Sequence, residues 1–299
     1  LDYVACWYRK AAGLMARNPA IRTAFVSTNS ITQVEQVGIL FPELFRHGVR
    51  IHFAHRTFQW SSEARGKAAV HCVIIGFADF DITPKWLFEY EHIKGEPQKT
   101  KAQNINQYLV DAPDIVLSNR SLPICPVPSI GIGNKPIDGG NYLFTEEEKI
   151  EFLKKEPQAE QYFRRWLGAD EFLYGYHRYC LWLGDCSPEQ LKKMPEAMKR
   201  IDAVRNFRLA SKSAPTRKIA DTPTRFHVEN MPSDEYILIS RVSSERRLYL
   251  PIGYIEAQNL TSDTALILIG AKLYHFGILT SIMHNAWMRT VCGRLESRY

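Results

Sequence analysis

The sequence contains no Cys-x-x-Cys pair and no apolar run long enough to span a bilayer. Its six cysteines are scattered over 299 residues, which argues against a disulfide scaffold and against a zinc ribbon. A signal-peptide pattern is also missing at the N-terminus. We therefore expect a protein of the reducing cytoplasm, without a metal site and without a membrane partner.

The sequence also lacks an initiator Met, two adjacent prolines, and a glycine-rich loop between a strand and a helix. The one Gly-x-Gly, at Gly131 and Gly133, leads into Asn134-Lys135-Pro136, which is typical of a turn and not of a cofactor loop. The missing Met indicates a piece of a longer polypeptide.

What is present is ordinary for a globular protein. Apolar residues make up 45% and charged residues 23% of the chain. The length predicts two domains, each able to bury a core. The net charge of +6 is compatible with an anionic partner, although the distribution of charge matters more than its sum.

The first part of the chain predicts a layered sheet. Segments 1–17, 24–31 and 33–48 have the patterns of a helix, a strand and a helix. Two apolar segments, 51–54 and 69–77, then predict an antiparallel hairpin, and the second is so continuously apolar that both of its faces should be covered. This order is that of the closing half of a doubly wound α/β sheet whose last strand is inserted antiparallel.

The hairpin loop carries aromatic and basic side chains. Phe58 and Trp60 are two residues apart, so both rings should project to the same side of an extended backbone. Arg56, Arg65 and Lys67 surround them. Rings framed by cations suit nucleic acid, because bases stack on rings while phosphates pair with Arg and Lys. The alternative is that these rings pack beneath the loop.

The segment after residue 77 turns polar and predicts the end of the first domain and a linker. A capping pattern at Thr145 and Glu148 predicts a long helix over 145–166. The aromatic-rich stretch that follows is expected to be mostly core. His177, Cys180 and Cys186 match no closed tetrahedral metal set.

Positive charge concentrates between Lys192 and Lys218, where nine Lys or Arg stand against two acids. Five of these cations are predicted to lie within one helix, several on one face, and are candidates for phosphate contact: Lys199, Arg200, Arg205, Arg208 and Lys212. The alternative is an ordinary solvated helix face.

Residues 236–254 predict two strands around a charged turn. Four side chains there are candidates for contact with base edges or phosphates: Arg241, Glu245, Arg246 and Arg247. The alternative is a Glu-Arg salt bridge that pins the turn. Residues 273–295 predict one apolar helix in which His284 is structural.

Several blocks resemble the MmeI-type (type IIL/IIG) restriction-modification enzymes, in the order of that family: LDYVACWYRKAA, AFVSTNSITQVEQV, FAHRTFQWSSEARGKAAVHCVIIGF, VSSERRLYLPIG and FGILTSIMHNAWMRTVCGRL. In that family one polypeptide joins a nuclease, an adenine-N6 DNA methyltransferase, a target recognition domain and a helical C-terminal part. Val34 departs from the family, which usually has Gly at this position.

The resemblance implies a division of the chain. Residues 1–95 would be the closing half of a class I (Rossmann-like) methyltransferase sheet, 96–120 a linker, 121–270 an α+β target recognition domain, and 271–299 the start of a helical tail. Leu1 would follow the catalytic tetrapeptide, Asp/Asn-Pro-Pro-Tyr/Phe, so this piece alone would neither methylate nor cut DNA.

The resemblance also implies a function. The parent enzyme would use S-adenosylmethionine, none of it bound to this piece, and its partners would be double-stranded DNA and the missing nuclease and cofactor-binding parts. Phe58 is the first candidate for stacking on a flipped adenine, and Trp60 the second. The alternatives are a sequence-blind nucleic-acid-binding or assembly module, and part of an RNA-modifying enzyme.

Overall fold

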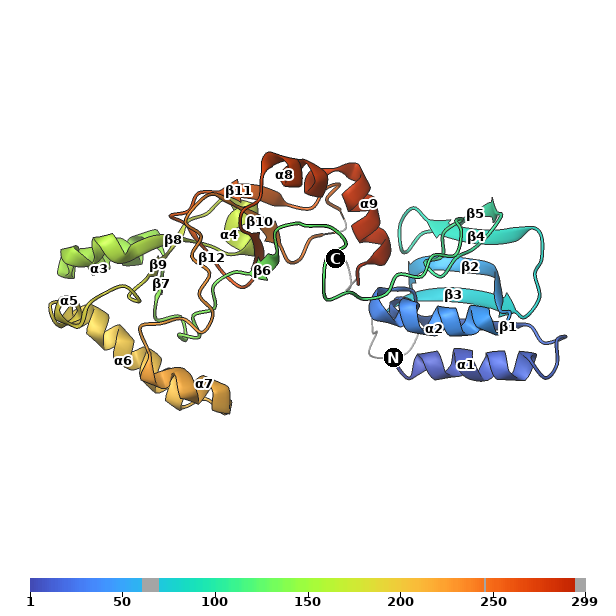
Figure 1. Ribbon diagram of the computed structural model, residues 1–299, viewed down its shortest axis with the longest axis horizontal. Helices are drawn as coiled ribbons and strands as arrows, with labels where there is room; N and C mark the ends of the chain where they lie inside the picture. The colour runs from blue at the N-terminus through green and yellow to red at the C-terminus, as the bar shows by residue number, and fades with distance from the viewer. Residues whose placement is uncertain (61–69, 245, 294–299) are drawn as a thin grey trace. The chain divides into compact units, whose positions relative to one another are not determined.

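The computed structural model describes residues 1–60, 70–244 and 246–293. They form two compact units, one of Leu1–Cys125 with the segment that starts at Ala286, the other of Pro126–Asn285. Both units mix helices with sheets (Figure 1), which confirms the predicted α/β class at this coarse level. Within the described ranges, no helix has the length and apolar character needed to cross a bilayer.

The first unit is built on one five-stranded sheet in the order β1-β3-β2-β4-β5. Its elements are α1 (Val4–Met15), β1 (Thr23–Thr28), the 3-10 helix η1 (Asn29–Thr32), α2 (Val34–Arg46), β2 (Arg50–Gln59), β3 (His71–Ala78), β4 (Lys85–Tyr90) and β5 (Pro97–Ala102). β3 runs antiparallel to both β1 and β2, whereas β2 and β4 are parallel. The predicted antiparallel pairing of the hairpin is confirmed, but its first strand continues to Gln59 and does not stop at residue 54.

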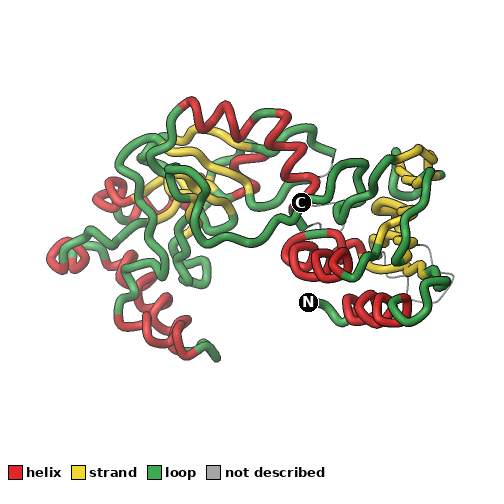
Figure 2. Tube along the Cα trace, turned by 45° about the vertical axis from the view of Figure 1, so that its right-hand side comes forward, coloured by secondary structure: helices red, strands yellow, loops and turns green. Residues whose placement is uncertain are grey.

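Helices α1 and α2 lie beside each other on one side of this sheet (Figures 1 and 2). Tyr8 of α1 stacks on Phe77 of β3 with ring centroids 5.4 Å apart, and its hydroxyl shares a 2.8 Å hydrogen bond with Ser27 of β1. Six of the eight β3 residues are buried, which confirms that both faces of this strand are covered. Gly76 is required there, because an added Cβ would lie 2.1 Å from the ring of Phe53.

Helix α2 begins with an unusual backbone conformation. Val34 has φ +54°, the left-handed region in which a β-branched side chain is strained and glycine is not. Val34 is 56% exposed, so its side chain contributes little to the packing. The positive φ gives a physical reason for the glycine that the family usually carries at this position.

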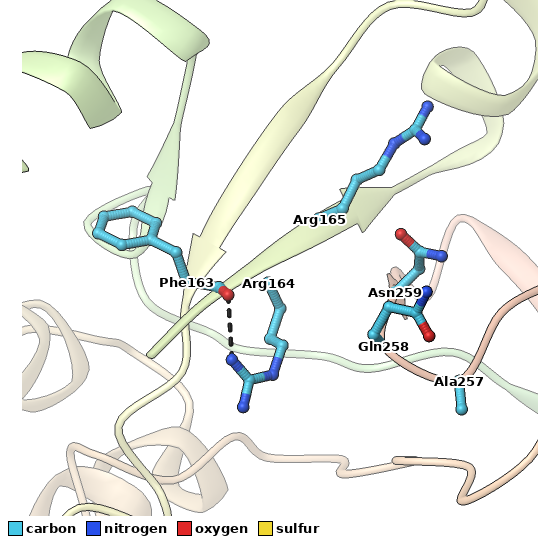
Figure 3. A pocket seen from close by; sticks show the side chains of 6 residues that line it. All are labelled: Phe163, Arg164, Arg165, Ala257, Gln258 and Asn259. Atoms are coloured by element: carbon cyan, nitrogen blue, oxygen red, sulfur yellow. Dashed lines mark hydrogen bonds between the residues drawn. The ribbon is translucent and has the colours of Figure 1, made fainter. Parts of the chain in front are cut away.

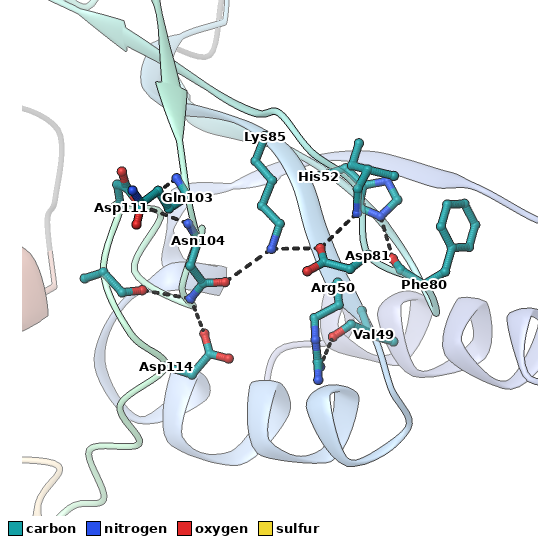
Figure 4. Close-up of polar contacts among 12 residues, drawn as sticks. Val49, Arg50, His52, Phe80, Asp81, Lys85, Gln103, Asn104, Asp111 and Asp114 are labelled. Carbon is teal, nitrogen blue, oxygen red and sulfur yellow. Dashed lines mark hydrogen bonds and ion pairs between the residues drawn. The ribbon is translucent and has the colours of Figure 1, made fainter.

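Residues 85–102, expected to be a polar domain end and linker, instead form β4 and β5 at the edge of the sheet. Lys85 is only 3% exposed and pairs with Asp81 at 2.9 Å and with Asn104 Oδ1 at 3.3 Å (Figure 4). The Gln103 and Asn104 amides in turn donate to Asp111. This network ties the segment after β5 to the sheet, and the predicted linker over 96–120 therefore includes an ordered strand.

The second unit contains two four-stranded sheets, in the orders β11-β10-β13-β6 and β12-β8-β9-β7. Its strands are β6 (Ile130–Ile132), β7 (Leu143–Phe144), β8 (Phe163–Leu167), β9 (Arg178–Leu181), β10 (Tyr236–Ser240), β11 (Ile252–Ile255), β12 (Leu260–Thr261) and β13 (Ala265–Leu268). Its α-helices are α3 (Glu146–Lys155), α4 (Ala169–Tyr174), α5 (Pro188–Lys192), α6 (Pro195–Leu209), α7 (Ala214–Lys218), α8 (Leu273–Thr280) and the start of α9 (Ile282–Val291), with 3-10 helices η2 (Pro157–Tyr162) and η3 (Ile219–Asp221).

Two predicted long helices are wrong in their extent. The capping box of Thr145 and Glu148 is present, but α3 ends at Lys155, before Pro157, and residues 163–167 form a strand. The helix predicted over 273–295 is divided at Ser281, whose hydroxyl accepts the His284 amide hydrogen at 3.1 Å and so caps α9. The ring of His284 contacts the Leu279 carbonyl at 2.7 Å, a structural role.

Candidate nucleic-acid interface

An aromatic pocket lies at the end of β2. It has a volume of about 270 Å³ and is lined by Phe58, Gln59, Trp60, Tyr90, Ile93, Lys94 and Gly95. The Gln59 amide donates to the Ile93 carbonyl at 2.8 Å, which holds the turn after β4 against β2. The rings of Phe58 and Trp60 are 6.2 Å apart between centroids, and Trp60 is 46% exposed. The prediction that these two rings share a side is consistent with this pocket.

Tyr90 supports Phe58 from the neighbouring strand. The two rings stack with centroids 5.3 Å apart, and the Tyr90 hydroxyl lies 2.8 Å from Nδ1 of His55. His55 itself stacks on Phe88 at 4.1 Å with nearly parallel planes. Burial lowers the pKa of His55 below its usual value, which favours the neutral ring that can accept a hydrogen bond from Tyr90. The sequence analysis missed Tyr90; its signal was the Phe88 and Tyr90 alternation in one strand.

The cations predicted around the hairpin rings are only partly described. Arg56 lies within β2, not in a loop, and pairs with Glu89 at 2.6 Å, both side chains being exposed. Exposed pairs of this kind contribute little to stability, so a phosphate can compete for the guanidinium. Arg65 and Lys67 lie outside the described residues.

The predicted phosphate-binding cations of the basic segment, residues 192–218, fall into two groups: some are exposed, and others are bound to groups of the protein itself. Lys199, Arg205 and Lys212 are exposed, and Lys199 pairs with Glu196 at 2.7 Å. Lys212 follows the end of α6 and is not part of it. Arg200 is half-buried, donates to the Asn141 carbonyl at 2.6 Å and lies 4.0 Å over the ring of Phe144. Three of the five predicted side chains are thus exposed.

The prediction that Arg208 contacts phosphate is wrong. Its side chain is 0% exposed and donates five hydrogen bonds, at 2.7 to 2.9 Å, to the backbone carbonyls of Pro136, Ile137, Ile219, Thr222 and Arg225. A signal for this was present in the sequence. Arg208 continues the buried stripe of Ala197, Ile201 and Val204, at the four-, three- and four-residue spacing of one helix face.

The charged turn lies between β10 and β11, which pair antiparallel as predicted. Arg241 is exposed and donates to the Asp263 carbonyl at 3.0 Å. Arg246 is exposed, and Arg247 is half-buried. Their backbone amides both donate to Ser244, so this serine shapes the turn. Glu245 lies outside the described residues, and with it the predicted Glu-Arg salt bridge.

The glycine pair Gly131 and Gly133 does not form a cofactor loop. Gly131 belongs to β6, an edge strand that pairs with β13. A Cβ on Gly133 would lie 2.1 Å from the Ser262 carbonyl oxygen, so this glycine allows two backbone segments to approach each other. Neither glycine stands at the start of a helix, where a nucleotide-like cofactor would be bound.

Two family models match the chain. Residues 1–89 match "MmeI, DNA-methyltransferase domain" and residues 111–299 match "MmeI, target recognition domain". A curated relative, DNA methyltransferase A of Bacillus subtilis (strain 168), is 39% identical over 300 residues, which cover 100% of this chain and 33% of that protein.

A solved structure is also similar. It is described as the type IIL restriction-modification enzyme MmeI in complex with DNA, and it matches with a TM-score of 0.87 and 50% sequence identity over 100% of this chain and 40% of that chain. The chain therefore spans about a third of the curated relative that it matches and two fifths of the solved chain.

Proposed function

This chain belongs to the MmeI family, and on that premise we propose that it recognises a short sequence in duplex DNA and presents one adenine for methylation at N6. The adenine is flipped out of the helix, because its exocyclic amine cannot be reached within the base stack. The rest of the parent polypeptide binds the methyl donor and carries the catalytic residues.

The two units divide this work. We assign residues 1–95 to the closing half of a class I methyltransferase sheet and 121–270 to a target recognition domain, with 96–120 between them and a helical tail from 271. The insertion of β3 antiparallel between β1 and β2 supports the first assignment. The match of residues 111–299 to the target recognition model supports the second.

The observation that carries the proposal is the aromatic pocket at the end of β2. A flipped base needs a ring to stack on, and stacking on an aromatic side chain is worth roughly 1–3 kcal/mol per base. Phe58 offers such a ring, held by Tyr90, and Trp60 offers an exposed second one. Lys94 lines the same pocket and provides a cation for the phosphate beside the flipped nucleotide.

We infer that S-adenosylmethionine supplies the methyl group and that the rest of the polypeptide binds it. The only Gly-x-Gly is strand and turn, and no two prolines are adjacent in the 299 residues, as the family's catalytic tetrapeptide requires. We therefore assign to this chain the binding and positioning of DNA, and to the rest of the polypeptide the transfer step.

The test is methylation by the full-length polypeptide. The protein is incubated with labelled S-adenosylmethionine and genomic DNA, and modified adenines are mapped. Label at adenine N6 within one short motif is expected. A sequence-blind binder would instead bind random duplex as tightly as any target, so that an equal concentration of random duplex would compete equally with it. An RNA-modifying enzyme would label single-stranded RNA and leave DNA unlabelled.

A further inference from the structure

A second pocket lies in the unit of Pro126–Asn285, along β8 (Figure 3). It has a volume of about 570 Å³ and is lined by Phe163, Arg164, Arg165, Ala257, Gln258 and Asn259. β12 pairs with β8 only at Trp166 and Leu167. Among the described residues, the edge of β8 at 163–165 therefore has no strand neighbour on the side of the turn over 257–259.

The two arginines of this pocket leave β8 in different directions (Figure 3). Arg164 donates through Nη1 to the carbonyls of Gln161 and Phe163 at 2.6 and 3.0 Å. Arg165 places Nη2 3.4 Å from Nε2 of His177, while its Nε is buried without a hydrogen-bond partner in the described part of the chain. An unpaired buried donor is unfavourable, and because this Nε is buried, a ligand in the pocket would contact the Nη atoms of Arg165 and not its Nε.

The turn over 257–259 faces β8 and contains one buried residue, Asn259, and one exposed residue, Gln258. Asn259 is 8% exposed, donates through Nδ2 to the Glu256 carbonyl at 3.2 Å, and accepts the Tyr236 hydroxyl at its own carbonyl at 3.0 Å. Gln258 is exposed and bonds to the carboxylate of Glu256. Asn259 is thus a positioning residue that holds the turn, while the amide of Gln258 is presented to solvent.

We infer that this pocket receives the base edges of duplex DNA, with Arg164, Arg165 and Gln258 as the reading side chains. Arg pairs with guanine O6 and N7, and Gln with adenine N6 and N7, in the major groove. The side chains that line the pocket include two cations and no carboxylate, and the adjacent Glu256 carboxylate accepts a hydrogen bond from the Gln258 amide. A phosphate needs only donors, whereas the Gln258 amide both donates and accepts, which suits a base edge.

The inference rests on the proposed function and is tested by selection from a random duplex library with the full-length polypeptide, which requires binding and not catalysis. Arg164→Ala and Arg165→Lys are expected to relax the selected motif at one position each, with loss of preference of roughly 5- to 150-fold there. Gln258→Glu is expected to exchange a preference for adenine for one for cytosine, since a carboxylate accepts from cytosine N4.

The matched control is Lys154→Ala, which removes an exposed cation of α3 that pairs with Glu151 and lies outside the pocket. It should leave the motif unchanged. Gln258 is exposed, so Gln258→Glu tests the inference even where an arginine variant fails to fold. The inference is overturned if the motif and the affinities stay unchanged in Gln258→Glu and in the arginine variants. It is also overturned by an equal loss of affinity on all sequences, which would assign the side chains to phosphate. If the wild-type protein selects no motif, the proposed function itself fails.

Discussion

The ring of Tyr90 stacks on that of Phe58, with centroids 5.3 Å apart and planes inclined by 24°. The two residues come from parallel neighbouring strands, β4 and β2. The orientation of the proposed base-stacking ring, Phe58, is therefore fixed by a residue that is distant in the sequence and becomes its neighbour because β2 pairs with β4.

Replacing Tyr90 by Ala is expected to lower kcat/KM for DNA methylation by roughly two- to tenfold, the equivalent of one aromatic pair. Phe58→Ala should lose more, roughly 5- to 150-fold, since base stacking is removed. Tyr90→Phe keeps the ring and serves as the control. The measurements are methylation kinetics of the full-length enzyme and the fluorescence of 2-aminopurine at the target position. Normal base flipping in Phe58→Ala would refute the stacking role.

Arg208 and Arg205 lie on the same helix, but their replacement should have different effects. Loss of Arg208 should lower stability, whereas loss of Arg205 should weaken DNA binding. Arg208→Ala removes a fully buried side chain together with five hydrogen bonds to backbone carbonyls and is expected to lower the free energy of unfolding by at least about 3 kcal/mol. Arg205→Ala removes an exposed cation. The free energy of unfolding of this variant should stay within about 0.5 kcal/mol of the wild type. The slope of log affinity against log salt should fall by the amount expected for the loss of one phosphate contact. Urea unfolding and duplex titrations at several salt concentrations separate the two.

Val34→Gly is expected to stabilise the first unit by about 1 kcal/mol, because glycine adopts φ +54° without strain. The unfolded chain gains entropy on the same substitution, which is why the expected gain is modest. Val116→Gly, at another exposed valine of the first unit whose φ is not positive, provides the comparison and should not stabilise. An unfolding midpoint that falls in Val34→Gly would show that the strain is compensated by contacts of the valine side chain.

The stability of the first unit should decline in mild acid through His55. Burial lowers the pKa of His55 in the folded state, so the unfolded chain takes up a proton first, near its ordinary pKa of about 6.5. The contribution of the neutral ring is complete above that pH and is lost as the pH falls toward the lower folded pKa. Unfolding midpoints at pH 7.5 and 5.5 should differ less in His55→Gln than in the wild type. His92→Gln, at an exposed histidine, controls for the loss of any imidazole, and an unchanged pH dependence in His55→Gln would contradict the assignment.

The elements that the sequence predicted correctly are specified by local signals. The hairpin, the capping box at Thr145 and the β10-β11 pair each depend on residues close together in the chain. β5 was missed because four of its six residues are exposed and its polar sequence lacks a strand pattern. Its place is set by partners elsewhere, as where Lys99 lies 3.8 Å over the ring of Trp86 on β4.

The candidate site was predictable in its residue types and less so in its geometry. Phe58 and Trp60 could be selected from their spacing, but the contact of Phe58 with Tyr90 depends on which strands become neighbours. Counting charges placed Arg208 among the cations available to DNA, although its helical register places it among buried residues. The pocket at Arg164 and Gln258 joins segments that are distant in the sequence and that carried no motif.

The five carbonyls held by Arg208 have a consequence for protein engineering. They belong to two stretches outside α6, 136–137 and 219–225. A chimaera that exchanges α6 between relatives to alter its outer surface must carry both stretches from the same donor, or retain arginine at this one position. Crossover points placed just outside residues 136 and 225 exchange the whole segment from β7 to η3 and keep Arg208 together with the five carbonyls that it binds.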